Sequence, residues 1–279
     1  MINLEDFYRW IKEDSPFGDY TTEILFKNDS RDISALIISK SEGLIACIED
    51  ICEVLEKFGI KCEVYIHSGK TISKGSVIAR LRGSLHKILL VERTILNLLM
   101  YLSGVATTTR RLVELVRSVN PNVRVAATRK ILPGLRYLVK KAVKIGGGDT
   151  HRFSLSDAVL IKDNHIKLIG SVRKAVEIAK RGVSFIHKVE VEVSNAHDAL
   201  EAAKAGADII MLDNVTPEEV EKTVKLLEVE GFRDKVIIEV SGGINPDNIV
   251  EYAKAGPDII STSYITMRPE IVDMSLEVE

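Results

Sequence analysis

The segments AKAGADII, residues 203–210, and AKAGPDII, residues 253–260, are two nearly identical pieces of one chain. In each, an alanine-rich helix ends at a glycine and leads into a short β-branched strand, because glycine readily takes the left-handed conformation that ends a helix. Repeated steps from helix to strand are typical of βα units with parallel strands. The pair favours a repetitive α/β barrel over an open, doubly wound sheet.

The same alternation extends on both sides of the repeats, from about Val123 onward. Short apolar runs alternate there with stretches of helical period, and such runs indicate parallel strands buried between helices. The strand-like runs are VRVAA, AVLIK, KVEVEV, DIIML, KVIIEV and DIIST.

The first hundred residues read differently, because Gly turns rather than regular helices separate their strands. The apolar stretch LLVERTILNLLMYLSG reads as a helix that joins them to the barrel. We therefore predict an α/β protein with an α+β domain at 1–105 and a barrel at 106–266. A C-terminal tail, 267–279, is expected to pack back on the first domain.

The charge balance points to a small-molecule site. The 279 residues include 38 basic and 40 acidic side chains, a net charge of -2, which favours neither nucleic acid nor an anionic membrane. We expect no segment with the roughly 20 apolar residues that a membrane-spanning helix requires. Acidic residues and Trp10 near the N-terminus predict part of the mature fold rather than a signal peptide.

The cysteines and the missing glutamines bear on the environment. Cys47, Cys52 and Cys62 are odd in number and lack metal-ligand spacing, so we expect no disulfide framework and a reducing cytoplasm. The sequence contains no glutamine and is rich in Lys, Glu, Ile and Val, a bias that indicates a thermophilic protein.

Charged side chains gather where the predicted barrel strands end. The ends of parallel barrel strands converge on one mouth, so these side chains are expected to form one site. Several cations with some carboxylates suit a polyanionic substrate and a metal ion. The residues, strand by strand, are Thr128, Arg129 and Lys130; Lys162, Asp163, Asn164 and His165; Glu190 and Glu192; Asp213 and Asn214; and Glu239.

Two glycine-rich segments complete the predicted mouth. SGGI, residues 241–244, follows a strand and precedes NPDNI, an arrangement in which backbone amides and a helix start bind phosphate. GGG, residues 146–148, exceeds what a helix end needs and is expected to carry His151 and Arg152 into the site. His165 is expected to support its strand end rather than act as a general base.

Read together, the motifs resemble the quinolinate phosphoribosyltransferase family over nearly the whole chain. The matching segments, in order, are FGDYTT, VERTILNLLMYLSGVAT, TRKILPGLR, KAVKIGGGDTHR, LIKDNHI, VEVEV, AGADIIMLDN and SGGINPDNI. The resemblance implies an N-terminal open sandwich, an incomplete barrel and a homodimer, or a higher homo-oligomer, with shared active sites. It also implies phosphoribosyl transfer from phosphoribosyl pyrophosphate (PRPP) to quinolinate with decarboxylation, which gives nicotinate mononucleotide.

Carried over position by position, the resemblance implies three groups of site residues. Glu192 and Asp213 face the ribose hydroxyls and the Mg²⁺ of PRPP, directly or through water. Lys130, Lys162, Glu192 and Asp213 are the expected catalytic residues. The residues expected to face quinolinate are Arg129, Lys130, His151, Arg152 and Lys162, with Arg93 from the partner subunit; Ser241, Gly242, Gly243 and Ser263 are expected to hold the 5′-phosphate.

The chain departs from the family pattern in two places. Ile131 and Leu132 follow TRK where the family usually has two threonines. Near the C-terminus, Ser263 replaces a glycine, and Met267 with Arg268 replaces a His-Ser pair.

Other functions stay open at this point. A relative associated with molybdate transport shares several motifs, but its PGTK is PGLR here. Nicotinate is an alternative acceptor, although several cations favour a dicarboxylate. An aldolase that uses Lys162 as a Schiff base, or a barrel that binds without turnover, is also an alternative.

Overall fold

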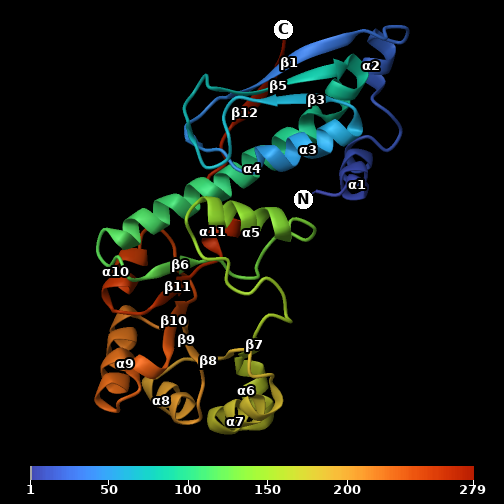
Figure 1. Ribbon diagram of the computed structural model, residues 1–279. Coiled ribbons are helices and arrows are strands. Elements are labelled where there is room, and N and C mark those ends of the chain that lie inside the picture. Colours follow the sequence, from blue (N-terminus) through green and yellow to red (C-terminus); the bar gives the residue numbers. More distant parts are fainter. Residues whose placement is uncertain (1) are drawn as a thin grey trace. The chain divides into compact units, whose positions relative to one another are not determined.

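The computed structural model describes residues 2–279, which fall into two compact units (Figure 1). Residues 137–146, which the sequence placed in the barrel, group with unit 1, and the domain limits 1–105 and 106–266 stay predictions. Unit 1 comprises residues 2–108, Tyr137–Gly146 and Pro269–Glu279, and unit 2 comprises Thr109–Arg136 and Gly147–Arg268.

The main sheet of unit 1 is antiparallel, with its strands in the order β12-β1-β5-β3. Ala35 and Ile37 on β1 are fully buried while their neighbours are partly exposed, the alternation of a sheet with one face on the core. Apart from α4, its elements are α1, Leu4–Asp14; α2, Tyr20–Leu25; β1, Asp32–Ser39; β2, Gly43–Leu44; α3, Ile48–Phe58; β3, Lys61–Val64; β4, Thr71–Ile72; β5, Val77–Ser84; α5, Arg136–Ile145; and β12, Met274–Val278.

Helix α4, Leu85–Arg117, corrects the expectation that no segment has membrane-spanning length. An 18-residue window of this helix has a mean hydropathy of 1.5, enough to cross a membrane by length and composition alone. However, 61% of that window is buried within the protein, which indicates a core helix. At Gly104 a side chain would lie 2.5 Å from the carbonyl oxygen of Glu270, so the C-terminal tail passes directly against the helix there.

The expectation of no disulfide is wrong, because Cys52 on α3 is bonded to Cys62 on β3. Helix α3 ends at Gly59, whose φ of 90° is the left-handed conformation, and the chain returns at once along β3. This turn brings the two Cα atoms to 5.3 Å. The odd cysteine is Cys47, which is free and buried.

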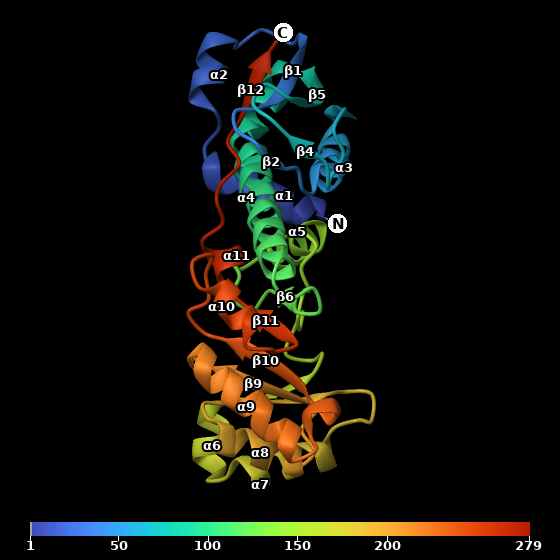
Figure 2. The ribbon, with the colours of Figure 1, turned by 90° about the vertical axis from the view of Figure 1, so that its left-hand side faces the viewer.

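Unit 2 contains a six-stranded parallel sheet in the order β6-β11-β10-β9-β8-β7. This order follows the chain around a circle and leaves one gap, between β6 and β7, as expected for an incomplete barrel. Helices α7, α8 and α9 lie side by side outside the strands (Figures 1 and 2). The elements are β6, Arg124–Ala126; β7, Val159–Ile161; α6, Asp163–Ile169; α7, Val172–Gly182; β8, Val189–Val193; α8, Ala196–Lys204; β9, Ile209–Asp213; α9, Pro217–Val229; η1, Arg233–Lys235; β10, Ile237–Ser241; α10, Ile249–Lys254; β11, Ile259–Ser261; and α11, Tyr264–Met267.

Side-chain caps set where three consecutive barrel helices begin. Ser171, Asn195 and Thr216 each stand just before a helix, and each side chain accepts a backbone N–H from its first turn. Such caps satisfy donors that have no partner within the helix. The side chains of the strand ends that precede these helices are thereby held at one end of the barrel.

The two repeats form the same structure twice. The carboxylate of Asp208, at the start of β9, accepts the N–H of Val189 on β8 at 2.7 Å, and that of Asp258, at the start of β11, accepts the N–H of Ile238 on β10 at 2.7 Å. Each carboxylate also pairs with a cation, Lys180 in the first case and Arg233 in the second.

A short segment after α5 lies in the gap of the barrel. Asp149 forms a parallel bridge with Ala126 on β6, with backbone hydrogen bonds of 2.8 and 2.9 Å. Three residues later, Arg152 Nη1 donates to the carbonyl of Ala158, just before β7, at 3.2 Å. Residues 149–152 therefore reach from one edge strand to the other.

Candidate active site

A cavity of about 390 Å³ lies at the carboxyl ends of the barrel strands. It brings together ten of the twelve substrate-site residues that the family resemblance implied, all except Arg93 and Ser263. Its lining residues are Thr128, Arg129, Lys130, His151, Arg152, Leu160, Lys162, Glu192, Met211, Asp213, Asn214, Ser241, Gly242, Gly243 and Ser261.

Two guanidinium groups in this cavity have unused donors. The Nε atoms of Arg129 and Arg152 are buried and have no hydrogen-bond partner within residues 2–279. Burial also lowers the pKa of Arg152, because the charged form loses hydration. A buried donor without a partner costs free energy, so an anionic ligand that accepted these N–H groups would be bound firmly.

Lys130 is held by its backbone rather than by its side chain. Its N–H donates to Thr128 Oγ1 at 3.1 Å, and its carbonyl accepts from Thr266 Oγ1 at 2.7 Å. The ammonium group is thus carried into the cavity by a fixed loop.

Lys162, Glu192 and Asp213 line the same cavity from the ends of β7, β8 and β9. Lys162 Nζ lies 3.0 Å from Glu192 Oε2. Burial and the neighbouring charge of Glu192 raise the pKa of Asp213. The backbone N–H of Lys162 donates to His165 Nδ1 at 2.9 Å, a contact consistent with the supporting role predicted for this histidine.

The glycine turn after β10 makes room for a close approach. Gly242 and Gly243 have φ values of 95° and 64°, and a side chain on Gly242 would lie 2.3 Å from Asn214 Oδ1. The helix expected directly after this turn is wrong in position, since α10 begins only at Ile249. The intervening amides are used in a turn, where Asn245 N–H donates to Asn248 Oδ1 at 2.9 Å.

A second cavity of about 400 Å³ shares this glycine turn. It contains the departures from the family pattern, Ser263, Met267 and Arg268. Arg268 supplies a cation where the pattern has a small polar residue. Its further lining residues are Thr128, Lys130, Ser241, Gly242, Gly243, Ile244, Asn245, Thr262 and Tyr264.

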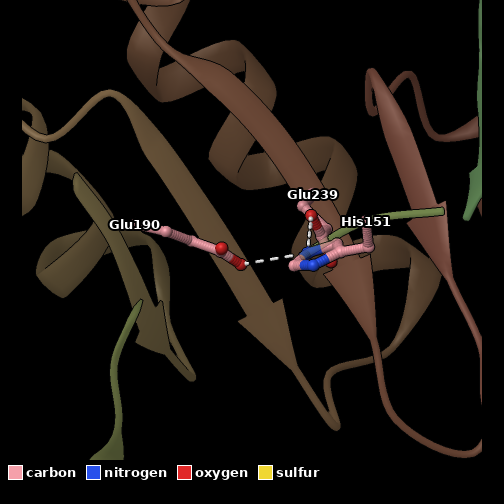
Figure 3. Close-up of side chains that lie close together, drawn as sticks. All are labelled: His151, Glu190 and Glu239. Carbon is pink, nitrogen blue, oxygen red and sulfur yellow. Dashed lines mark hydrogen bonds and ion pairs between the residues drawn. The ribbon is translucent and has the colours of Figure 1, made fainter. Parts of the chain in front are cut away.

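His151 points into the barrel toward two buried glutamates (Figure 3). Its Nε2 lies 3.2 Å from Glu239 Oε2 and 3.6 Å from Glu190 Oε1, and both carboxyl groups are almost fully buried. Its Nδ1 accepts the N–H of Arg152 at 2.7 Å. Both ring nitrogens are therefore engaged within the protein.

The geometry and the burial of this cluster determine the protonation of the His151 ring. Burial alone would lower the pKa of His151, but the hydrogen bonds and charges of Glu190 and Glu239 outweigh it and raise the pKa to about 10. In this geometry Nδ1 accepts the Arg152 N–H, so the ring hydrogen that faces the two glutamates is on Nε2. Burial also raises the pKa of Glu190, because its charged form loses hydration.

Comparison with known proteins decides the family. The model of the quinolinate phosphoribosyl transferase C-terminal domain matches residues 105–277, and that of the N-terminal domain matches residues 19–103. The chain belongs to the quinolinate phosphoribosyl transferase family.

Individual relatives agree with this family over nearly their whole length. A probable carboxylating nicotinate-nucleotide pyrophosphorylase of Methanothermobacter thermautotrophicus is 47% identical over 268 residues, 96% of each chain. The carboxylating nicotinate-nucleotide pyrophosphorylase of Homo sapiens is 34% identical and aligns with 96% of this chain and 89% of its own. The structure of the nicotinate-nucleotide pyrophosphorylase from Francisella tularensis matches with a TM-score of 0.89 at 35% identity, covering 100% of this chain and 98% of that one.

These matches confirm the quinolinate phosphoribosyl transferase family, the α/β fold and the carboxylating pyrophosphorylase activity that the motifs predicted. The roles of single site residues stay predictions. Arg93, the expected contribution from a partner subunit, is exposed on α4 in unit 1.

One polar lining residue of this family member, Ser261, escaped the sequence reasoning. Ser261 ends β11, is buried, and its hydroxyl has no hydrogen-bond partner within the described chain. The signal was present, because a polar residue that ends an apolar strand is the same pattern that identified Asp213.

Proposed function

We infer that this protein transfers the phosphoribosyl group of PRPP to quinolinate and releases pyrophosphate and carbon dioxide. The observation that carries this proposal is the division of one cavity into a cationic wall, a pair of carboxylates and a glycine turn. Quinolinate offers two carboxylates and PRPP several further negative charges, which only such a wall can hold side by side.

The cationic wall is the proposed acceptor site. Arg129 and Arg152 have buried N–H groups without partners, and a guanidinium matches a carboxylate in a bidentate contact. Lys130 follows β6 and Lys162 follows β7, so they add point charges at the two edge strands of the sheet. His151 lies in the same wall and is proposed as part of it.

The carboxylate pair is the proposed ribose and metal site. Glu192 and Asp213 present hard oxygen ligands, and burial together with the neighbouring charge of Glu192 raises the pKa of Asp213. A divalent cation would offset both carboxylate charges, so the residues fit Mg²⁺. When bound, Mg²⁺ offsets the charge of the departing pyrophosphate.

The glycine turn is the proposed 5′-phosphate site. Ser241, Gly242 and Gly243 leave the backbone accessible, and Ser263 with Arg268 lies in the adjoining cavity. The backbone donors here come from a loop rather than from a helix start.

The residues then act in two stages. The bond from C1′ to pyrophosphate breaks, the ring nitrogen bonds to C1′, and Glu192 and Asp213 stabilise the positive charge that develops on the ribose. The quinolinate nitrogen becomes cationic, so that when the adjacent carboxylate leaves as carbon dioxide the ring accepts its electron pair and then takes up a proton. The protein mainly positions and neutralises its substrates.

The proposed assembly is a homodimer in which Arg93 completes the acceptor wall of the other subunit. The exposure of Arg93 on α4 supports this assignment, because its guanidinium can reach a carboxylate outside its own helix. The cytoplasm is the proposed location. Because Cys52 and Cys62 are bonded, the cysteines no longer indicate a reducing compartment. Intracellular disulfides nevertheless occur in hyperthermophiles. A polyanion such as PRPP does not cross membranes unaided, which also favours an enzyme inside the cell.

The test is incubation with PRPP, Mg²⁺ and either quinolinate or nicotinate. We expect quinolinate labelled in the carboxylate next to the ring nitrogen to give labelled carbon dioxide together with nicotinate mononucleotide. Product from nicotinate without carbon dioxide would replace the proposed acceptor, and no product from either would indicate a barrel that binds without turnover.

A further inference from the structure

The cluster of His151, Glu190 and Glu239 lies beneath the acceptor wall and is not explained by substrate binding alone. Glu239 is 0% exposed and Glu190 is 1% exposed, and one oxygen of each has no hydrogen-bond partner within residues 2–279. Burying two carboxyl groups costs free energy, so we expect them to hold a specific hydrogen-bonding partner. The atom that both of them face is His151 Nε2 (Figure 3).

The ring of His151 connects this cluster to the cavity. Its Nδ1 accepts the backbone N–H of Arg152, and the Nε atom of Arg152 is one of the two unpartnered donors of the acceptor wall. Glu239, the histidine ring and the Arg152 amide therefore form a continuous chain of contacts from the barrel interior to the cavity.

The backbone at His151 needs such an anchor. Its φ of 53° is left-handed, which is unfavourable for a residue with a side chain. The segment that carries it is joined to β6 at Asp149, by a backbone bridge and an ion pair with Arg124, and to the residue before β7 by Arg152. The contact between the His151 ring and Glu239 attaches this segment to the interior of the barrel.

A metal ion is the main alternative occupant, since the three ligand atoms lie within 4.8 Å of one another. A histidine that binds metal through Nε2 normally donates a proton from Nδ1 to an acceptor. Here Nδ1 accepts a hydrogen bond from the Arg152 N–H instead, which places the ring hydrogen on Nε2, the atom that a metal would need. The geometry favours a hydrogen-bonded anchor over a metal site.

We propose that Glu239 is a positioning residue that acts through His151 to place Arg152 for binding of the acceptor carboxylate. Glu190 faces the same imidazole nitrogen from β8. The inference rests on the proposed function for the identity of the acceptor. Glu239 touches no substrate in this scheme, and its effect reaches the cavity only through the imidazole.

The experiment is a double-mutant cycle on Glu239→Ala and His151→Ala, with kcat and both KM values measured by carbon dioxide release. We expect Glu239→Ala to raise the KM for quinolinate at least about tenfold and to change the KM for PRPP by less than about twofold. In the His151→Ala background, Glu239→Ala should add less than about twofold, because its route to the cavity is already lost. Fold changes that multiply in the double variant, or equal losses for both substrates, would overturn the proposal.

Two further variants separate positioning from general damage. Glu239→Gln keeps an oxygen that accepts from Nε2, so it should hold the quinolinate KM within about threefold of wild type. Glu228→Ala removes an exposed carboxylate of α9 and is the matched control. If Glu239→Gln behaves like Glu239→Ala, orientation through a hydrogen bond is not the mechanism.

Metal analysis of the purified wild type completes the test. Stoichiometric zinc that is lost in Glu239→Ala would overturn the proposal in favour of a metal site, whereas metal-free active enzyme supports it. Failure of the wild type to release carbon dioxide contradicts the proposed function. In that case the cycle is repeated on quinolinate affinity by calorimetry, with the same expected fold changes.

Discussion

Lys162 and Glu192 form an ion pair between neighbouring strand ends, with Nζ 3.0 Å from Oε2. The glutamate side chain is 13% exposed and the lysine side chain is 50% exposed, so the pair joins the covered part of the cavity to its open part. It also joins the proposed acceptor wall to the proposed ribose site. Removing either partner should therefore affect more than one substrate.

Removing a lysine from the cationic wall should strongly reduce turnover. We expect Lys130→Ala and Lys162→Ala each to lower turnover at least about a hundredfold, because each loses a charge-assisted contact with an anionic substrate. Steady-state assays of carbon dioxide release measure this, with the exposed Lys174→Ala as the matched control. Wild-type kinetics in either variant would remove that lysine from the site.

The carboxylate pair should control the use of PRPP. Glu192→Gln and Asp213→Asn keep the side-chain shape but lose the charge that the ribose cation and Mg²⁺ need. We expect the KM for PRPP and the Mg²⁺ requirement to rise more than the KM for quinolinate. Titration of each substrate separates these effects, and a selective loss of quinolinate binding would reverse the assignment.

Arg93 can be tested by mixing subunits. Arg93→Ala and Lys130→Ala should each be nearly inactive, but mixed dimers would contain one site with both residues intact. Random exchange of equal amounts should recover roughly a quarter of wild-type activity, because half the dimers are mixed and half their sites are complete. Mass spectrometry of tagged subunits verifies exchange. Mixed dimers without activity would show that Arg93 does not act across the interface.

The cysteines allow a test of unit 1. Burial and the charge of Asp50 raise the pKa of Cys47 to about 12, so its thiol stays neutral at pH 8 and should resist alkylation in the folded protein. After denaturation without reductant we expect one reactive thiol, and after reduction three. Mass spectrometry counts the alkylated groups. Three thiols without reductant would contradict the Cys52–Cys62 bond.

The mouth of the barrel was predictable because of its topology. Parallel strands that follow one another along the chain bring their carboxyl ends together, so Lys130, Lys162, Glu192 and Asp213 could be grouped without coordinates. The repeats 203–210 and 253–260 identified the βα units for the same reason, since local periodicity is written directly in the sequence.

Other features depend on contacts that spacing does not encode. The direction of the His151 ring is set by Glu239, which is 88 residues away in the chain. The disulfide depends on the turn at Gly59, and the apolar character of α4 reflects burial rather than a membrane. Each of these is a tertiary relationship, and a single sequence provides no direct signal for it.

The carboxylates of Asp208 and Asp258 stand at the starts of β9 and β11, whereas Asp213 and Ser261 end the same strands inside the cavity. In each of these two strands, the aspartate that bonds to the neighbouring strand and the residue that lines the cavity therefore lie at opposite ends. Substitutions at the cavity end can therefore change which acceptor the site binds, while the aspartate at the other end keeps the strand in register. A mutant library limited to the cavity ends should accordingly stay well expressed while its substrate preference changes.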